Sequence, residues 1–211
     1  MNEVRTAFLE CARISATILR LLEVGARWEE PSALEHFSMK GLAGHLVRAT
    51  GSVEAYLDRP EPEGAPISAA EYYAAAVDTT DIQSELHVAV RAKGEAEAAE
   101  GHAALVQKLD GIIERLETRL ATEPVTRRME VFKGLVLTLD DYLLTRLVEQ
   151  VVHCDDLAVS LGLETPAFPD GAIDLAVGTL VDVARFRHGD LAVLRALTRR
   201  ERDAVSALRV L

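Results

Sequence analysis

Three side chains of metal-binding type stand out for their positions in the chain. His45 lies three residues after Leu42 and one before Leu46, within an apolar stripe, so its ring is expected to face the protein core. Glu149 and His153 are four residues apart in the segment LLTRLVEQVVHCDDLA, and this spacing places both on one face of a helix. The pattern predicts one imidazole on one helix and a carboxylate–imidazole pair on another, all pointing inward.

The helix that carries Glu149 and His153 is apolar around almost its whole circumference. Apolar residues cover the side opposite the pair and also flank it: Leu144, Leu147, Val148, Val151, Val152, Leu157 and Ala158. A charged pair there loses several kcal/mol of hydration unless it pairs, hydrogen-bonds, changes protonation or binds a cation. Spacing alone leaves two hypotheses open. Either His45, Glu149 and His153 hold a divalent metal with a fourth position for water or substrate, or they form a satisfied buried network.

Two further polar side chains of this helix are candidate catalytic residues. Arg146 lies three residues before Glu149, where it could bind an anionic substrate or neutralise the carboxylate. Asp156 lies three residues after His153 and could accept the second ring proton of that histidine, which would orient the ring. Cys154 projects about 100° away from His153, which favours a small core residue over a ligand.

The elements that position these groups are predicted to be helices. Ser38 is the expected N-cap of the helix that carries His45, because its side-chain oxygen can accept from free backbone amides. Thr138 is expected to begin the helix that carries Glu149, which runs to about Leu161 and ends at Gly162.

The rest of the chain is also predicted to be mainly helical. Helices are expected over residues 2–24, 105–120 and 169–187, with a short capped helix after Ser68 and an extended stretch over 129–139. Residues 191–211 fit either short strands or a final helix. We therefore predict an all-α fold, with residues 1–165 as a helical bundle and 166–211 as a C-terminal extension packed on the same domain.

The residues around the predicted site resemble a known family. The segment SMKGLAGHL around His45 and the later segment TRLVEQVVHCDDLA resemble the DinB-like superfamily, closest to the mycothiol-dependent maleylpyruvate isomerase N-terminal domain family. The resemblance covers most of the first 160 residues. It implies a DinB-like four-helix bundle with a divalent metal, usually zinc, on the residues that match His45, Glu149 and His153. Nickel is among the other metals that such donors accept.

The resemblance also implies an activity. Family members of known activity use the metal to bind and activate the thiol of a small cofactor such as mycothiol. Metal ligation deprotonates a thiol near neutral pH, and the resulting thiolate is the nucleophile. We therefore expect a metal-dependent, mycothiol-type transferase or isomerase that acts on a small electrophile.

The sequence is also compatible with two other functions. The first is a non-catalytic helical module that binds a metal or a thiol. The second is a structural helical protein that associates through a face of its bundle. A homodimer is compatible with each of these readings.

Composition restricts the partners and the compartment. The chain of 211 residues has 23 Lys and Arg against 34 Asp and Glu, a formal net charge of −11 at pH 7, which argues against nucleic acid and anionic membranes as partners. The sequence has no run of about 18 apolar residues, so no membrane span is predicted. Charged residues interrupt the N-terminal segment, so no signal peptide is predicted. Only two cysteines, Cys11 and Cys154, are present, which suits the reducing cytoplasm.

Overall fold

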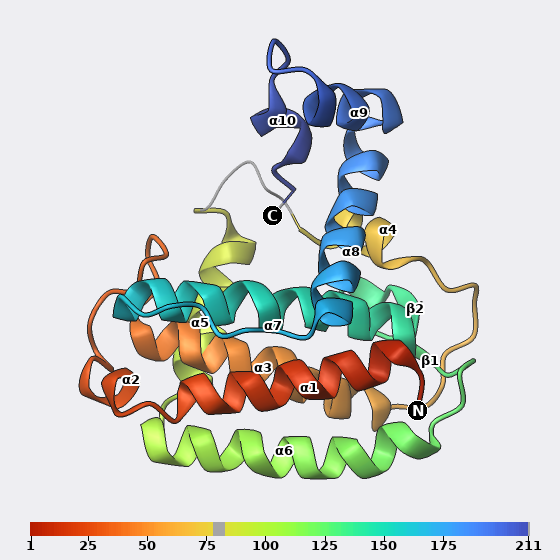
Figure 1. The fold of residues 1–211 in the computed structure, drawn as a ribbon. Coiled ribbons are helices and arrows are strands. Elements are labelled where there is room, and N and C mark those ends of the chain that lie inside the picture. Colours follow the sequence, from red (N-terminus) through yellow and green to blue (C-terminus); the bar gives the residue numbers. More distant parts are fainter. Residues whose placement is uncertain (78–82, 211) are drawn as a thin grey trace.

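The computed structural model describes residues 1–77 and 83–210, so residue 211 of the predicted extension lies outside the described residues. Four long helices form a bundle (Figure 1): α1 (Glu3–Leu19), α3 (Met39–Leu57), α6 (His102–Thr122) and α7 (Leu139–Leu161). The described chain also contains α2 (Leu22–Ala26), α4 (Ala69–Ala76), α5 (Glu85–Glu97), α8 (Asp170–His188), α9 (Asp190–Thr198) and α10 (Ala204–Leu208). The predicted all-α fold with a four-helix bundle is confirmed.

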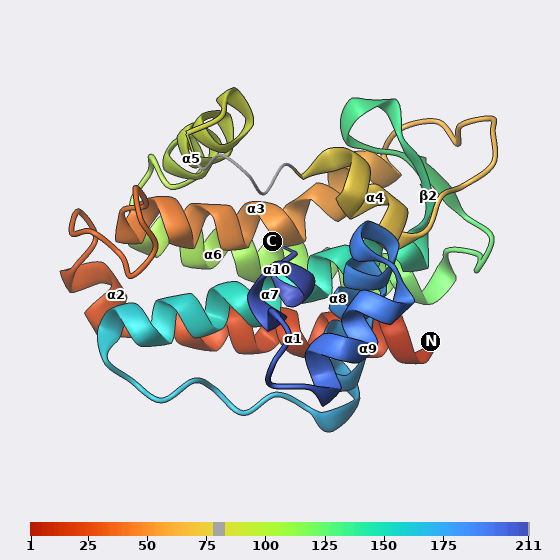
Figure 2. The same ribbon diagram turned by 90° about the horizontal axis from the view of Figure 1, so that it is seen from above.

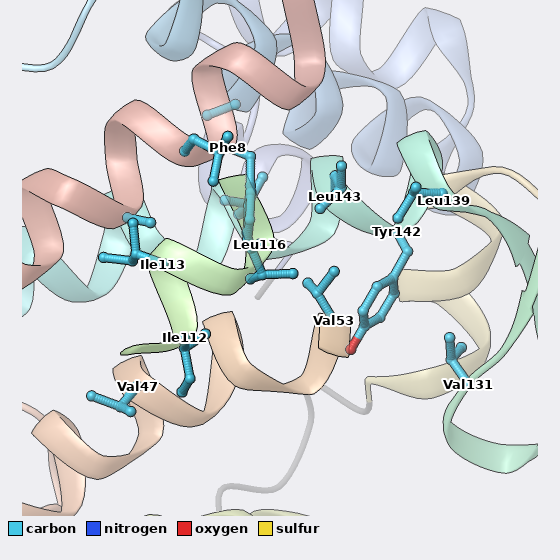
Figure 3. Close-up of a cluster of buried hydrophobic side chains, with 14 of the residues drawn as sticks. Phe8, Val47, Val53, Ile112, Ile113, Leu116, Val131, Leu139, Tyr142 and Leu143 are labelled. Carbon is cyan, nitrogen blue, oxygen red and sulfur yellow. The ribbon is translucent and has the colours of Figure 1, made fainter. Parts of the chain in front are cut away.

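The core of the bundle is made of side chains from all four long helices. Figure 3 shows Phe8 of α1, Val53 of α3, Leu116 of α6 and Leu143 of α7 close together, and each of them is fully buried. Burying one such side chain stabilises the fold by about 1.5–3 kcal/mol. This shared core fixes α3 beside α7, which is the pairing that the predicted site requires.

The caps predicted for the two site helices are present. The Ser38 hydroxyl accepts a hydrogen bond from the Gly41 amide at 2.9 Å and begins α3. Thr138 accepts from the Asp141 amide at 3.1 Å and begins α7. Gly162 ends α7 with a φ of 71°, a left-handed conformation that favours glycine. Both site helices therefore begin at their predicted caps, and α7 ends at the predicted glycine.

A small antiparallel hairpin leads into α7. Strands β1 (Arg128–Glu130) and β2 (Val136–Thr138) pair with Met129 opposite Leu137. The connection includes a single turn of 3₁₀ helix in which Lys133 has a φ of 61°. This hairpin confirms the extended stretch predicted over 129–139.

One prediction about the first half of the chain is wrong. The predicted helix over 2–24 is interrupted, because Leu21 is extended and a new helix, α2, follows it. The apolar pattern continues across this break, with Val24 buried, so periodicity did not indicate it. His102 at the start of α6 packs beside the break, with Nε2 2.6 Å from the Leu19 carbonyl oxygen and its ring 5.4 Å from that of Trp28.

Helix α5 has no counterpart in the sequence prediction. Gly94 is its only buried residue, so it lacks the apolar stripe that indicates a core helix. It packs closely on α3 through glycines instead: a Cβ atom added to Gly44 would lie 2.0 Å from the Gly94 carbonyl oxygen.

The C-terminal part is helical rather than extended. Helix α8 packs against α1, α4 and α7, and Arg187 near its end still donates to the carbonyl oxygens of Tyr73 in α4 and of Val77. Helices α9 and α10 lie at the far end of α8 (Figures 1 and 2). This resolves the ambiguity of residues 191–210 in favour of short helices. Among the described residues, no helix combines the length and apolar character needed to cross a membrane.

Candidate metal centre

The structure brings His45, Glu149 and His153 together. His45 comes from the middle of α3, while the other two come from successive turns of the neighbouring helix α7. One ligand atom from each residue lies within 4.8 Å of the others. The side chains are largely buried, with exposed fractions of 11%, 16% and 15% in that order. The convergence expected from the sequence is therefore present in the fold.

A single carboxylate oxygen lies at the centre of the group. Oε2 of Glu149 is 3.0 Å from Nε2 of His45 and 3.2 Å from Nε2 of His153. The two imidazole rings meet edge to face, with their centroids 4.7 Å apart. Two nitrogens and one oxygen therefore face a common point from two helices.

Asp156 completes the surroundings of His153. Its Oδ2 lies 2.8 Å from Nδ1 of His153, so both ring nitrogens of His153 face a carboxylate. A neutral imidazole has only one N–H and cannot donate to both carboxylates. Either a second proton or a metal cation must therefore lie between His153 and Glu149.

Without a metal, protons fill this role. Burial by itself lowers the pKa of His153, but its hydrogen bonds to Asp156 and Glu149 raise it to about 9. Burial likewise raises the pKa of Glu149, yet the bonds from His153 and His45 and the charge of Arg146 hold it well below its usual range. A cationic imidazole next to a carboxylate is thus the metal-free state of the group.

His45 differs from His153. Burial lowers the pKa of His45, and its Nδ1 is a buried atom with no hydrogen-bond partner among the described residues. The neutral ring keeps one nitrogen with a free lone pair, which is the form that binds a metal. Two imidazole nitrogens and one carboxylate oxygen are a donor set that fits Zn²⁺ with an open fourth position. The residues present therefore fit a divalent metal.

Arg146 supplies a second positive charge to this region. Its Nε donates to the Thr145 hydroxyl at 3.1 Å, its guanidinium lies 5.0 Å from the centre of the Tyr142 ring, and Nη2 is 4.0 Å from Oε1 of Glu149. Burial lowers the pKa of Arg146, but its interactions with Tyr142 and with the Glu149 carboxylate outweigh burial and raise the pKa. The arginine is thus placed to stabilise the Glu149 carboxylate. None of the described residues accepts a hydrogen bond from its Nη atoms.

Sequence reasoning missed the contact made by Phe37. This ring meets the His45 ring edge-on, with the centroids 6.1 Å apart. Phe37 directly precedes the N-cap Ser38 and packs in the same apolar cluster as Leu42. A hydrophobic residue before an N-cap that meets one in the first turns is a recognisable sequence signal, and here it fixes the loop over His45.

Cys154 is not placed to act as a ligand. It is fully buried, its sulfur lies 3.3 Å from the Ser15 hydroxyl, and burial raises the pKa of its thiol to about 12. This agrees with the small core residue expected from the sequence. Two cavities of about 410 and 520 Å³ lie elsewhere on the surface, and neither is lined by the three converging residues.

Comparison with known proteins gives one family match. A family model described as the mycothiol maleylpyruvate isomerase N-terminal domain matches residues 8–158. Among solved structures, a crystal structure of the mycothiol-dependent maleylpyruvate isomerase is 16% identical, covers 84% of this chain and 68% of that chain, and has a TM-score of 0.49. A histidine mutant of that isomerase has the same identity and coverage and a TM-score of 0.48. No curated protein matches the chain.

Proposed function

The chain belongs to the mycothiol maleylpyruvate isomerase N-terminal domain family, and we propose that it is a metal-dependent enzyme that uses a small thiol of the mycothiol type. The thiol attacks a small electrophile, so the reaction is a thiol transfer or a thiol-assisted isomerisation. The reducing cytoplasm is the proposed setting, which the two buried free cysteines suit.

The observation that carries this proposal is the convergence of three donors on one point. His45, Glu149 and His153 would hold the metal, with zinc preferred and nickel as the alternative. When bound, such a metal lowers the pKa of a coordinated thiol, so that the nucleophilic thiolate forms near neutral pH.

Three side chains would orient the ligands and set the charge of the site. Asp156 would accept the Nδ1 proton of His153, which leaves the Nε2 lone pair free for the metal that His153 would share with Glu149. Glu149 contributes one negative charge to the site, and Arg146 holds that carboxylate in its anionic form. The guanidinium of Arg146 also has free Nη donors beside the site, which suits an electrophile that carries negative charge.

The proposal is tested by metal content and turnover in the same preparations. Full-length wild type, His45→Ala and His153→Ala are loaded with zinc and dialysed, then incubated with mycothiol and a panel of electrophiles that includes maleylpyruvate. His188→Ala is the matched control, because that histidine is exposed at the end of α8.

We expect one zinc per chain and thiol-dependent product formation in wild type and in the control, and neither in the two site variants. Equal and negligible zinc in all four proteins would reject the metal site. Full zinc occupancy without product from any thiol would reject the catalytic part alone.

The low exposure of the three donor side chains, 11–16%, favours a second candidate function. In this alternative the same site holds a metal or a thiol in a non-catalytic module. It predicts that mycothiol binds to the zinc-loaded chain and leaves it chemically unchanged.

A further inference from the structure

The C-terminal helices expose an unusual share of apolar side chains. Six of the thirteen large hydrophobic residues exposed in the described chain lie between residues 177 and 205: Val177, Phe186, Leu191, Leu194, Leu197 and Val205. Three of these leucines follow one another at three-residue steps along α9, so they form a stripe on one side of that helix. Such a concentration on a segment that stands away from the bundle indicates a docking surface.

The same segment is positively charged, although the chain is acidic. Residues 185–210, here called the basic arm, contain seven arginines and three acidic side chains. The rest of the chain contains 16 Lys or Arg against 31 Asp or Glu. Arg195 and Arg202 make no side-chain ion pair or hydrogen bond with any described residue. The arm therefore suits a partner whose surface is acidic as well as partly apolar.

The first half of α8 offers such a surface on the chain itself. Asp170 and Asp174 are exposed one turn apart, and neither has an ion-pair partner in the described part of the chain. Glu3 adds a third exposed carboxylate, since its Oε1 would lie 3.7 Å from a Cβ added to Gly171. Val177 follows on the next turn and is 53% exposed. Acidic residues thus lie near the start of α8 and the basic arm follows its end.

The middle of α8 can approach another helix closely. Gly178 is exposed near the midpoint of this 19-residue helix, and a Cβ added there would have no neighbour within 4 Å. Glycine in a helix interior is unfavourable by about 1 kcal/mol relative to alanine, and none of the described residues fills the space beside Gly178. A second helix crossing at this point would be such a neighbour.

We propose that the chain forms a two-fold symmetric homodimer through α8 and the basic arm. A two-fold axis near Gly178 places the two α8 helices antiparallel. The acidic start of each α8, a helix about 28 Å long, then faces the basic arm of the other copy. A stable interface buries about 800 Å² from each partner. The symmetric contact uses both the leucine stripe and the acidic face of each copy, which makes it self-complementary.

This inference does not depend on the proposed function, because no residue in it belongs to the candidate metal centre. Sedimentation of the full chain over a hundredfold range of concentration tests it. We expect a dimer whose dissociation constant rises with salt, because ion pairs at the interface are screened.

A charge exchange tests the pairing itself. Arg185→Glu and Asp170→Arg should each give a monomer. An axis at Gly178 places residue 170 of one copy opposite residues 185–186 of the other, so the double variant should dimerise again because opposite charges are restored there. Lys93→Glu on α5 changes the net charge by the same amount as Arg185→Glu and should leave the dimer intact. Gly178→Gln should give a folded monomer, because its side chain has space in the single chain but not at a helix crossing.

Three results would overturn the proposal. The first is a wild type that sediments as a monomer at every concentration. The second is a dimer that persists in Arg185→Glu, Asp170→Arg and Gly178→Gln. The third is a monomer that binds phosphatidylserine vesicles through the same leucines, which would assign the arm to an anionic membrane instead.

Discussion

At the scale of single residues, the chemistry of the site depends on how the two histidines are held. His153 is clamped between Glu149 and Asp156, whereas His45 has no partner at Nδ1 among the described residues. The clamped ring has its orientation fixed and the other has more freedom. Residue types alone do not distinguish these two environments, because the difference comes from the neighbouring turns of α7.

The clamp gives a prediction for Asp156. Asp156→Ala removes the acceptor at His153 Nδ1, and the loss of such an outer hydrogen bond weakens metal affinity by about 10–100-fold. Asp155→Ala is the matched control, since that neighbouring carboxylate is exposed and bonds Thr165 instead. Competition with a zinc chelator measures both affinities. Equal losses in the two variants would show that Asp156 does not orient the ligand.

At the scale of the elements, one buried arginine ties three helix ends together. Arg5 is 3% exposed and bonds Asp140 at the start of α7 at 2.8 Å, the Leu120 carbonyl oxygen at 2.9 Å and the Glu123 carbonyl oxygen at 2.6 Å. Arg5→Ala leaves these acceptors without their donor, so we expect the free energy of unfolding to fall by about 3–5 kcal/mol.

Arg13→Ala is the comparison for that experiment. Arg13 pairs with Glu117 on the surface, where both side chains are well exposed, so its loss should cost less than about 1 kcal/mol. Urea unfolding of both variants gives the two values. The stabilising role of the Arg5 contacts would be refuted if Arg5→Ala were no more destabilising than Arg13→Ala.

The contact of α3 with α5 gives a second prediction at this scale. Gly44→Ala places a methyl group against the Gly94 backbone, which cannot move aside as a flexible side chain can, so we expect a loss of about 3 kcal/mol. Gly111→Ala in α6 meets only the end of Arg115 and should be neutral or stabilising. A thermal melt of each variant reports the difference. A stable Gly44→Ala protein would show that the two helices are further apart than described.

The sequence predicts the elements that have local signals and misses those that lack them. Ser38, Thr138 and Gly162 mark the ends of α3 and α7 because capping uses side chains or a left-handed residue at fixed positions. Helix α5 has no such signal. It packs on α3 through a glycine, so its sequence shows no helical repeat of apolar residues. The hydrogen bonds of Arg5 join residues more than 100 positions apart, and a pattern in the neighbouring sequence cannot indicate such contacts.

At the scale of the whole molecule, the fold separates two roles. The four-helix bundle positions the candidate metal centre between α3 and α7, while α9 and α10 stand away from it at the far end of α8 (Figure 1). Helices α8 to α10 present the surface proposed for dimerisation. The division of the chain into a bundle over residues 1–165 and an extension over 166–211 packed on the same domain remains a proposal. A change in one region should therefore leave the other largely unaffected.

The central claim is that His45, Glu149 and His153 share one cation. X-ray absorption at the zinc edge of the loaded full chain tests it most directly, because it reports the ligand types and distances around the metal. The account predicts nitrogen and oxygen ligands at about 2.0–2.2 Å, the scattering of two imidazole rings, and no sulfur at about 2.3 Å before a thiol is added. Sulfur ligation in the thiol-free protein, or fewer than two imidazoles, would contradict it.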